Sequence, residues 1–208
     1  MPDLSALAAD ERRDLADYLS TLTDSEWSQP SLCPGWSVRD VVGHIASYDV
    51  LGWPATLGLL ARSGFSLARA NAAGVAASRS MSTESLVSRL RECAEPRGIT
   101  RGFGCAIALT DGIIHQQDIR RALGHPRTVP SARLVAALSF LPRARVLPSP
   151  RNLRGIRVVA TDVSWSHGSG PSVRGPGEAL LLALAGRPAA LPELSGAGLA
   201  VLAARVHG

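Results

Sequence analysis

Residues 105–124 read CAIALTDGIIHQQDIRRALG, and this segment decides the fold. Apolar residues recur in it at helical spacing. Gly124 follows the last periodic residue, and Pro126 lies just beyond, which is the usual way for a helix to end. We therefore predict a helix over residues 105–123.

Three polar side chains share one face of this predicted helix. Asp111 and His115 are four residues apart, and Asp118 lies three residues further on. A carboxylate and an imidazole one turn apart can bind the same divalent metal ion. The same spacing is also common in exposed N-to-C pairs on any helix. The pair alone leaves both interpretations open.

Two flanking segments carry the helical pattern as well. Residues 3–22 place Leu and Ala at three-and-four spacing between charged residues, and residues 66–95 are helical with a break near Met81 and Ser82. With one more helix that begins near Ser37, these segments predict a four-helix bundle.

That helix follows a turn made by Pro34 and Gly35. Ser37, with Asp40 three residues later, forms an acidic variant of the capping box that opens a helix. We predict that the helix runs toward residue 53, with a kink at the proline that follows.

His44 lies on this helix among valines and an isoleucine. A lone histidine in such a place is more often a satisfied core residue, because a buried imidazole needs a partner. In a bundle, however, inward-facing polar groups from two helices meet. His44 with Asp111 and His115 then makes a two-histidine, one-carboxylate metal site with an open position, which is the catalytic kind.

The sequence changes character after residue 141, where prolines mark a linker. We predict a mainly α protein with two domains: a metal-binding helical bundle over residues 1–141 and a small α+β domain over residues 142–208. The expected elements of the second domain are a strand over residues 155–165, a turn over 166–170, a short strand over 172–174, a helix over 177–186 and a short strand or helix over 199–206.

Composition removes several function classes. The chain has 208 residues, and all 22 of its basic side chains are Arg, against 17 acids. The absence of Lys excludes Schiff-base and P-loop lysine chemistry. Residues 120–157 hold nine Arg and no acid, which predicts an anion-attracting rim beside the active site or a solvated basic surface. One aromatic residue and five prolines in that stretch argue against a nucleic-acid partner.

The remaining composition indicates a cytoplasmic protein. Cys33, Cys93 and Cys105 are widely spaced, so we expect buried or incidental thiols rather than a zinc finger or a disulfide scaffold. Apolar runs fall short of the ~18 residues of a membrane span, and the N-terminus does not read as a secretory signal. We expect no membrane partner, and a monomer or homodimer.

Two motifs carry a family resemblance. The segment CPGWSVRDVVGH, residues 33–44, and the segment HQQDIRRALG, residues 115–124, resemble the mycothiol-dependent maleylpyruvate isomerase family of the DinB-like metalloenzyme superfamily. The segment VRGPGEALLLALAGR, residues 173–187, is similar to the closing strand and helix of that family's C-terminal portion.

The resemblance implies a DinB-like four-helix bundle that binds a divalent metal, usually zinc. It assigns His44, Asp111 and His115 as metal ligands and catalytic residues, with mycothiol as thiol cosubstrate. The mycothiol sulfur would take the open position as thiolate. The family's isomerase adds the thiolate across a cis double bond, permits rotation and eliminates it, and relatives resemble thiol S-transferases. Asp118 would orient His115 or bind one of the arginines that follow it.

Two residues qualify this assignment. The family's isomerase has Glu where this chain has Asp111. Because the Asp side chain reaches about one methylene less far, direct ligation, ligation through a water and a weakened metal site all stay open. Arg174 is a candidate for binding the cofactor or clamping a substrate carboxylate, and the alternative is a solvent-facing side chain.

The sequence therefore predicts an enzyme: a metal-dependent, mycothiol-using thiol transferase or isomerase that acts on a small electrophile, with a carboxylate-bearing substrate as one option. The alternatives are a non-catalytic ligand-binding or sensing protein of the same fold and a nucleic-acid-binding bundle. The Arg-only basic composition fits a high-GC actinobacterial source that makes mycothiol.

Overall fold

The helix predicted from residues 105–123 forms. In the computed structural model, which describes residues 3–49 and 53–207, α7 runs over Ala106–Leu123. It ends at Gly124, whose φ of 71° is the left-handed conformation that glycine adopts without strain. Most of its residues are buried although several are polar. A helix buried in this way has neighbours on most of its faces.

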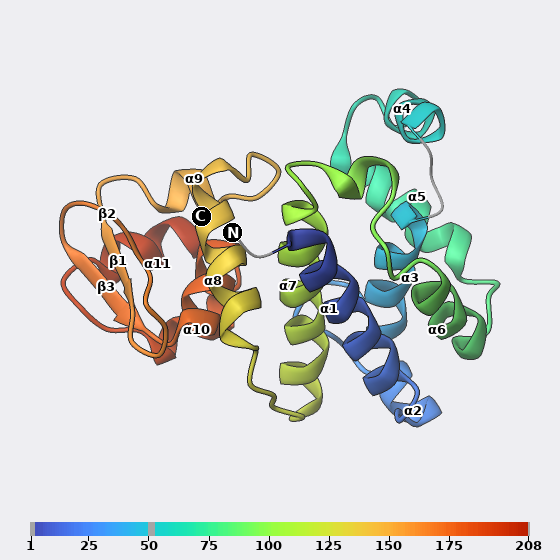
Figure 1. The fold of residues 1–208 in the computed structure, drawn as a ribbon, viewed down its shortest axis with the longest axis horizontal. Coiled ribbons are helices and arrows are strands. Elements are labelled where there is room, and N and C mark those ends of the chain that lie inside the picture. The colour runs from blue at the N-terminus through green and yellow to red at the C-terminus, as the bar shows by residue number, and fades with distance from the viewer. Residues whose placement is uncertain (1–2, 50–52, 208) are drawn as a thin grey trace. The chain divides into compact units, whose positions relative to one another are not determined.

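Three helices complete a bundle with α7: α1 (Leu4–Leu19), α3 (Val38–Asp49) and α6 (Thr83–Glu92). Both α1 and α3 contact α6 and α7, and the four run alongside one another (Figure 1). The predicted four-helix bundle is confirmed. Its apolar core consists of Leu15, Ala16, Leu19, Trp27, Val38, Val41, Val42, Ile45, Ala46, Leu86, Val87, Leu90 and Ile119.

Local capping sets where the bundle helices begin. Ser37 Oγ accepts the backbone N–H of Asp40 at 3.2 Å, and the Asp40 carboxylate accepts the backbone N–H of Ser37 at 3.1 Å, which confirms the predicted capping box. Ser82 caps α6 through the N–H of Ser85 at 3.2 Å, which confirms the predicted break in the third helical segment.

Shorter helices surround the bundle. The helix predicted to run toward residue 53 is described as far as Asp49, and another helix begins at Trp53. Residues 50–52, through which the helix was predicted to continue, lie outside the described residues. The additional elements of this part are α2 (Asp24–Trp27), α4 (Trp53–Arg62), α5 (Leu67–Ser78) and the 3-10 turn η1 (Gly98–Arg101).

Small residues let α3 and α5 approach closely. A Cβ added at Gly43 would lie 2.0 Å from Ser78 Oγ, and one added at Gly74 would lie 2.6 Å from Ser47 Oγ. These separations are far below van der Waals contact, so only glycine fits at either position. The close approach fixes α3, and with it His44, against the neighbouring helix.

The chain divides into two compact units, Met1–Arg127 and Thr128–Gly208, of which the second is α+β. Its three-stranded sheet has the order β2-β1-β3, with β1 antiparallel to β2 and parallel to β3. The almost fully buried helix α10 contacts β1 and β3. Its elements are α8 (Ser131–Phe140), η2 (Leu141–Arg143), α9 (Ser149–Asn152), β1 (Arg157–Ala160), β2 (Ser166–Gly168), β3 (Ser172–Gly175), α10 (Gly177–Leu184), η3 (Pro188–Glu193) and α11 (Leu199–His207).

The division falls before α8, whereas the sequence places it after residue 141. The reason is packing: a Cβ added at Gly177 of α10 would lie 3.1 Å from Leu134 and 3.2 Å from Leu138, so α8 lies directly on α10. A boundary between Arg127 and Thr128 leaves that contact within one unit.

Two local predictions in the second unit need correction. The strand expected over residues 155–165 covers only Arg157–Ala160. The turn expected over residues 166–170 is wrong, because Ser166–Gly168 forms β2 and pairs with β1. Every residue of β2 is exposed, so no alternation of apolar side chains marks it in the sequence. The predicted partner strand near 172–174 and the helix over 177–186 are confirmed as β3 and α10, and residues 199–206 are helical.

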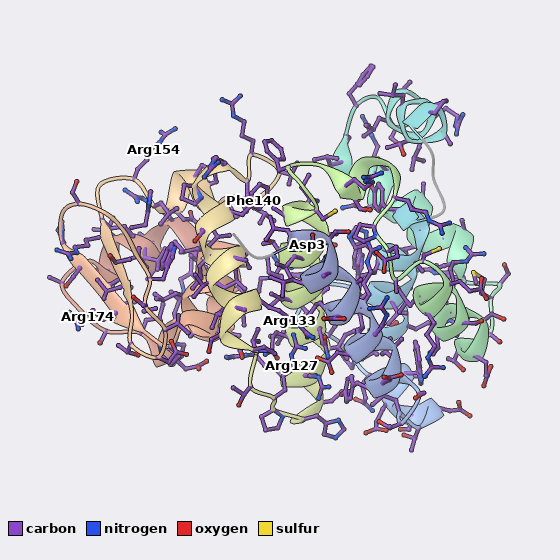
Figure 2. All side chains as sticks on the ribbon, in the orientation of Figure 1. Asp3, Arg127, Arg133, Phe140, Arg154 and Arg174 are labelled. Carbon is purple, nitrogen blue, oxygen red and sulfur yellow. The ribbon has the colours of Figure 1, made fainter. Side chains whose placement is uncertain are left out.

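Two arginines of the basic stretch stabilise the first unit. The guanidinium of Arg120 lies 3.7 Å from the centre of the Tyr18 ring. Arg127, labelled in Figure 2, pairs with the buried Glu11 and, at 2.7 Å, with Asp14. These two side chains hold α1 to the end of α7 and the segment after it. Within the described ranges, no helix combines the length and hydropathy of a membrane span.

We expect Gly43→Ala to lower the free energy of unfolding by about 1–2 kcal/mol, because overpacking costs about 1–3 kcal/mol and Ala returns up to ~1 kcal/mol in helix propensity. Urea denaturation measures it. Gly58→Ala on α4 is the control, because its Cβ meets only the mobile end of Arg62 at 3.3 Å and should not destabilise. Unchanged stability in Gly43→Ala would contradict the close approach.

Candidate metal centre

Helices α3 and α7 bring together the three ligand candidates predicted from the sequence. His44, Asp111 and His115 each offer one ligand atom, and these atoms all lie within 4.8 Å of one another. The two imidazole rings have centroids 5.0 Å apart at an interplanar angle of 78°. Both histidines are buried, whereas the Asp111 side chain is 41% exposed. The cluster is therefore buried on its histidine side and reachable at its carboxylate.

His115 lies between two carboxylates. Its Nε2 is 3.4 Å from Asp111 Oδ1, and its Nδ1 is 3.0 Å from Asp118 Oδ2. The Asp118 side chain is fully buried. Because an ionised carboxylate can only accept hydrogen bonds, the Asp118 contact assigns the proton of neutral His115 to Nδ1. Nε2 is then the nitrogen with a free lone pair, and it faces Asp111.

The separation of His115 Nε2 and Asp111 Oδ1 fits two ligands of one tetrahedral zinc ion. Nitrogen and oxygen ligands at about 2.0–2.1 Å from zinc are about 3.3 Å apart when the angle between the bonds is tetrahedral. The observed distance of 3.4 Å between His115 Nε2 and Asp111 Oδ1 is close to that value. The shorter arm of Asp111 thus still reaches the position that a direct ligand would take.

The surroundings of His115 favour a positive charge. Burial alone would lower its pKa, but the negative charge of Asp111 and the hydrogen bonds that His115 makes with Asp111, Asp118 and Cys33 outweigh burial and raise the pKa well above the usual value. In metal-free protein these contacts favour the protonated form of the imidazole. A metal ion binding there displaces a proton from His115.

Aromatic rings enclose His44. The ring centroids of Trp36 and Tyr48 lie 5.2 Å and 5.5 Å from that of His44. Tyr48 donates its hydroxyl proton to Asn71 Oδ1 at 2.6 Å. Burial, followed by the negative charge of Asp111, raises the Tyr48 pKa, so this phenol stays protonated at neutral pH. The rings hold the His44 imidazole in place.

A tight turn places Cys33 beside α7. The N–H of Trp36 donates to the carbonyl of Cys33 at 3.0 Å, and Gly35 has a φ of 76°. With proline and glycine as its central residues, this is a type II turn, which confirms the predicted turn. The Cys33 thiol lies 3.0 Å from Asp118 Oδ2 and 3.7 Å from His115 Nδ1.

The sequence alone misses the position of Cys33. It predicts buried or incidental thiols, and Cys93 and Cys105 are indeed buried and not disulfide-bonded. Cys33 instead belongs to a second group of potential ligands, together with His115 and Asp118. The only sequence feature that could have indicated this position is that Cys33 is the first residue of the segment 33–44, which also contains His44.

The two remaining site candidates lie in different units. Asp118 hydrogen-bonds His115, the first of the partners considered for it. Arg174 is on β3 in the second unit, where its side chain is exposed (Figure 2) and its backbone exchanges two 2.8 Å hydrogen bonds with Ser195. A role for Arg174 in binding a cofactor or a substrate carboxylate stays a prediction.

Comparisons with known proteins find one family model and two solved structures that resemble this chain. Residues 8–97 match the sequence model of the mycothiol maleylpyruvate isomerase N-terminal domain. The fold is similar to two crystal structures, those of the mycothiol-dependent maleylpyruvate isomerase and of its histidine-to-alanine variant. Each is 13% identical over 95% of this chain and 93% of the other, with TM-scores of 0.57 and 0.56. No curated protein matches the sequence. These matches support the predicted family, and the two solved structures confirm the predicted DinB-like fold.

The raised pKa of His115 predicts a pH-dependent stability in metal-free protein. A folded-state pKa above the unfolded value of ~6.5 contributes stability that is complete below pH ~6.5 and is lost as pH rises through the folded pKa. Asp111→Asn removes the main favourable charge. We expect wild type to exceed this variant in stability most at pH ~6, and the difference to shrink as pH rises.

Urea denaturation of chelator-treated protein at several pH values measures this difference. Asp10→Asn is the control, because Asp10 is exposed on α1 and pairs with Arg13 rather than with a histidine. A difference between wild type and Asp111→Asn that stays constant with pH would contradict the charge assignment.

Proposed function

We propose that this chain belongs to the mycothiol-dependent maleylpyruvate isomerase family and is a metal-dependent enzyme. It would use mycothiol to isomerise a small electrophile or to transfer the thiol to it. The observation that carries the proposal is the convergence of His44, Asp111 and His115 from two helices within 4.8 Å. Two imidazoles and one carboxylate leave a tetrahedral ion with one open position, as catalytic zinc sites do.

The donor set supports a divalent metal, and zinc is the ion we propose. Imidazole and carboxylate ligands suit zinc, and the 3.4 Å separation of His115 Nε2 and Asp111 Oδ1 agrees with direct ligation by both. When bound, such a metal lowers the pKa of a coordinated thiol, so that mycothiol would be present as the thiolate at neutral pH.

The residues around the cluster have separate tasks in this proposal. Asp118 holds the proton of His115 at Nδ1 and so keeps the lone pair of Nε2 available for a metal ion. Trp36 and Tyr48 pack against the His44 ring and keep water from that side. The half-exposed Asp111 marks the side from which thiol and substrate would enter.

The reaction requires no nucleophile from the protein. In the isomerase case, the mycothiol thiolate adds to one carbon of a cis double bond, and the former double bond rotates as a single bond. Elimination then breaks the carbon–sulfur bond and returns the thiolate, so nothing is consumed. In the transferase case, the carbon–sulfur bond remains, and the neighbouring carbon, which carries the negative charge after addition, takes up a proton from water.

Metal content tests the centre first. We expect purified wild type to bind about one equivalent of zinc and the His44→Ala/His115→Ala variant to bind almost none, because two of three ligands are lost. Elemental analysis after dialysis measures both. His167→Ala/His207→Ala is the matched control, since both histidines are exposed in the second unit. Equal, near-zero metal in wild type and the ligand variant would contradict the proposal.

The thiol requirement is tested by turnover. With maleylpyruvate or other unsaturated acids as substrates, we expect product only when mycothiol is present. Asp111→Ala should lose most activity together with its metal, whereas Asp111→Glu, which restores the family's carboxylate, should keep both. Chromatography of product and of free thiol separates isomerisation from transfer. A wild type that holds zinc but neither isomerises nor consumes mycothiol with any electrophile would favour a ligand-sensing protein.

A further inference from the structure

We infer that Cys33 is a positioning residue for the metal centre, because its thiol donates to the carboxylate of Asp118 that orients His115. This inference rests on the proposed function, since it assigns a task within the same site. Cys33 does not touch the reacting atoms. Its effect on the centre passes through Asp118 to His115 Nδ1, and from there to the orientation of Nε2.

One oxygen atom connects the three residues. Asp118 Oδ2 accepts the thiol of Cys33 at 3.0 Å and the Nδ1–H of His115 at 3.0 Å. The side chain of Asp118 is fully buried, so bulk water does not solvate this oxygen. A buried carboxylate depends on its protein donors, because a missing hydrogen bond there is not replaced by water. The thiol therefore contributes to keeping Oδ2 at the position that the imidazole needs.

The backbone holds Cys33 in this position at three points. The N–H of Leu32 donates to the carbonyl of Asp118 at 3.0 Å, next to the contact of the thiol with the carboxylate. Ser31 Oγ accepts the N–H of Cys33 at 3.1 Å, and the type II turn fixes the far side. The loop and α7 are thus joined by backbone and side chain at the same residue, Asp118. Such a double tie leaves the thiol little freedom to move away.

Distances argue against Cys33 as a metal ligand. Sulfur at about 2.3 Å and oxygen at about 2.0 Å from a tetrahedral zinc lie about 3.5 Å apart. The observed 3.0 Å between Cys33 Sγ and Asp118 Oδ2 is a hydrogen-bond distance instead. The two ring nitrogens of His115 also face different groups, Asp118 and Asp111. A metal at the Cys33 side would have to displace the hydrogen bond between His115 and Asp118.

Substitutions at Cys33 separate its donor from its volume. Cys33→Ser keeps a hydroxyl donor, whereas Cys33→Val keeps an apolar group of similar size and removes the donor. Partners that orient a metal-binding histidine change metal affinity by about 10–100-fold when lost. Because Cys33 acts through Asp118, we expect a loss of zinc affinity at the lower end of that range, about tenfold, in Cys33→Val, and an affinity within about threefold of wild type in Cys33→Ser. Cys93→Ala is the control, because Cys93 is a buried cysteine at the end of α6, outside both groups of potential ligands.

Competition with a chromophoric chelator measures the zinc affinities, and circular dichroism verifies that each variant is folded. The pattern of a weakened Cys33→Val beside an intact Cys33→Ser supports the inference, and a purely structural thiol would not give that rescue. Equal affinities in wild type and Cys33→Val overturn it. If Cys33→Val does not fold, Cys33→Ala replaces it with the same expected loss.

Cobalt substitution of wild type, in the absence of any added thiol, distinguishes positioning from ligation. A thiolate ligand gives cobalt an intense near-ultraviolet charge-transfer band, and we expect none. A band that disappears in Cys33→Ser would make Cys33 a ligand and overturn the inference while leaving a metal protein. Absence of any metal binding in wild type would remove the proposed function itself, and the inference with it.

Discussion

The hydrogen bond between His115 Nδ1 and Asp118 Oδ2 is the interaction on which the rest of the site depends. Burying a carboxylate completely is costly unless donors surround it, and His115 is one of those donors at 3.0 Å. The bond turns Nε2 toward Asp111 and His44. The same requirement explains why the loop before α3 folds back onto α7 and brings the Cys33 thiol to the same oxygen.

The bundle supplies the second half of the site through close helix packing. At Gly43 and Gly74, α3 and α5 lie so close together that no room is left for a Cβ atom. This close packing fixes the position of α3, and with it the imidazole of His44. Trp36 and Tyr48 then restrict the His44 ring from two sides. A short loop motif and a glycine-lined helix contact therefore set the geometry of a cluster whose members are far apart in sequence.

Features that follow from local sequence patterns or from helical periodicity were predictable from the sequence. Helix α7, its stop at Gly124 and the capping box at Ser37 follow from local patterns, and the convergence of His44 with Asp111 and His115 follows from the inward faces of two helices. The contact of Cys33 with Asp118 joins residues 85 positions apart, and no periodicity marks it. Strand β2 was not predicted because all of its residues are exposed, so no apolar side chains mark it. The boundary between the two units differs from the predicted one because α8 packs on α10.

The position of a bound metal ion tests the central claim most directly. Anomalous diffraction at the zinc absorption edge, from crystals grown with zinc, locates the ion without reference to activity. We expect it at about 2.0–2.2 Å from nitrogen atoms of His44 and His115 and from an oxygen of Asp111, with Asp118 still hydrogen-bonded to His115. Zinc bound to Cys33 and His115 Nδ1, with the Asp118 hydrogen bond broken, would contradict the account.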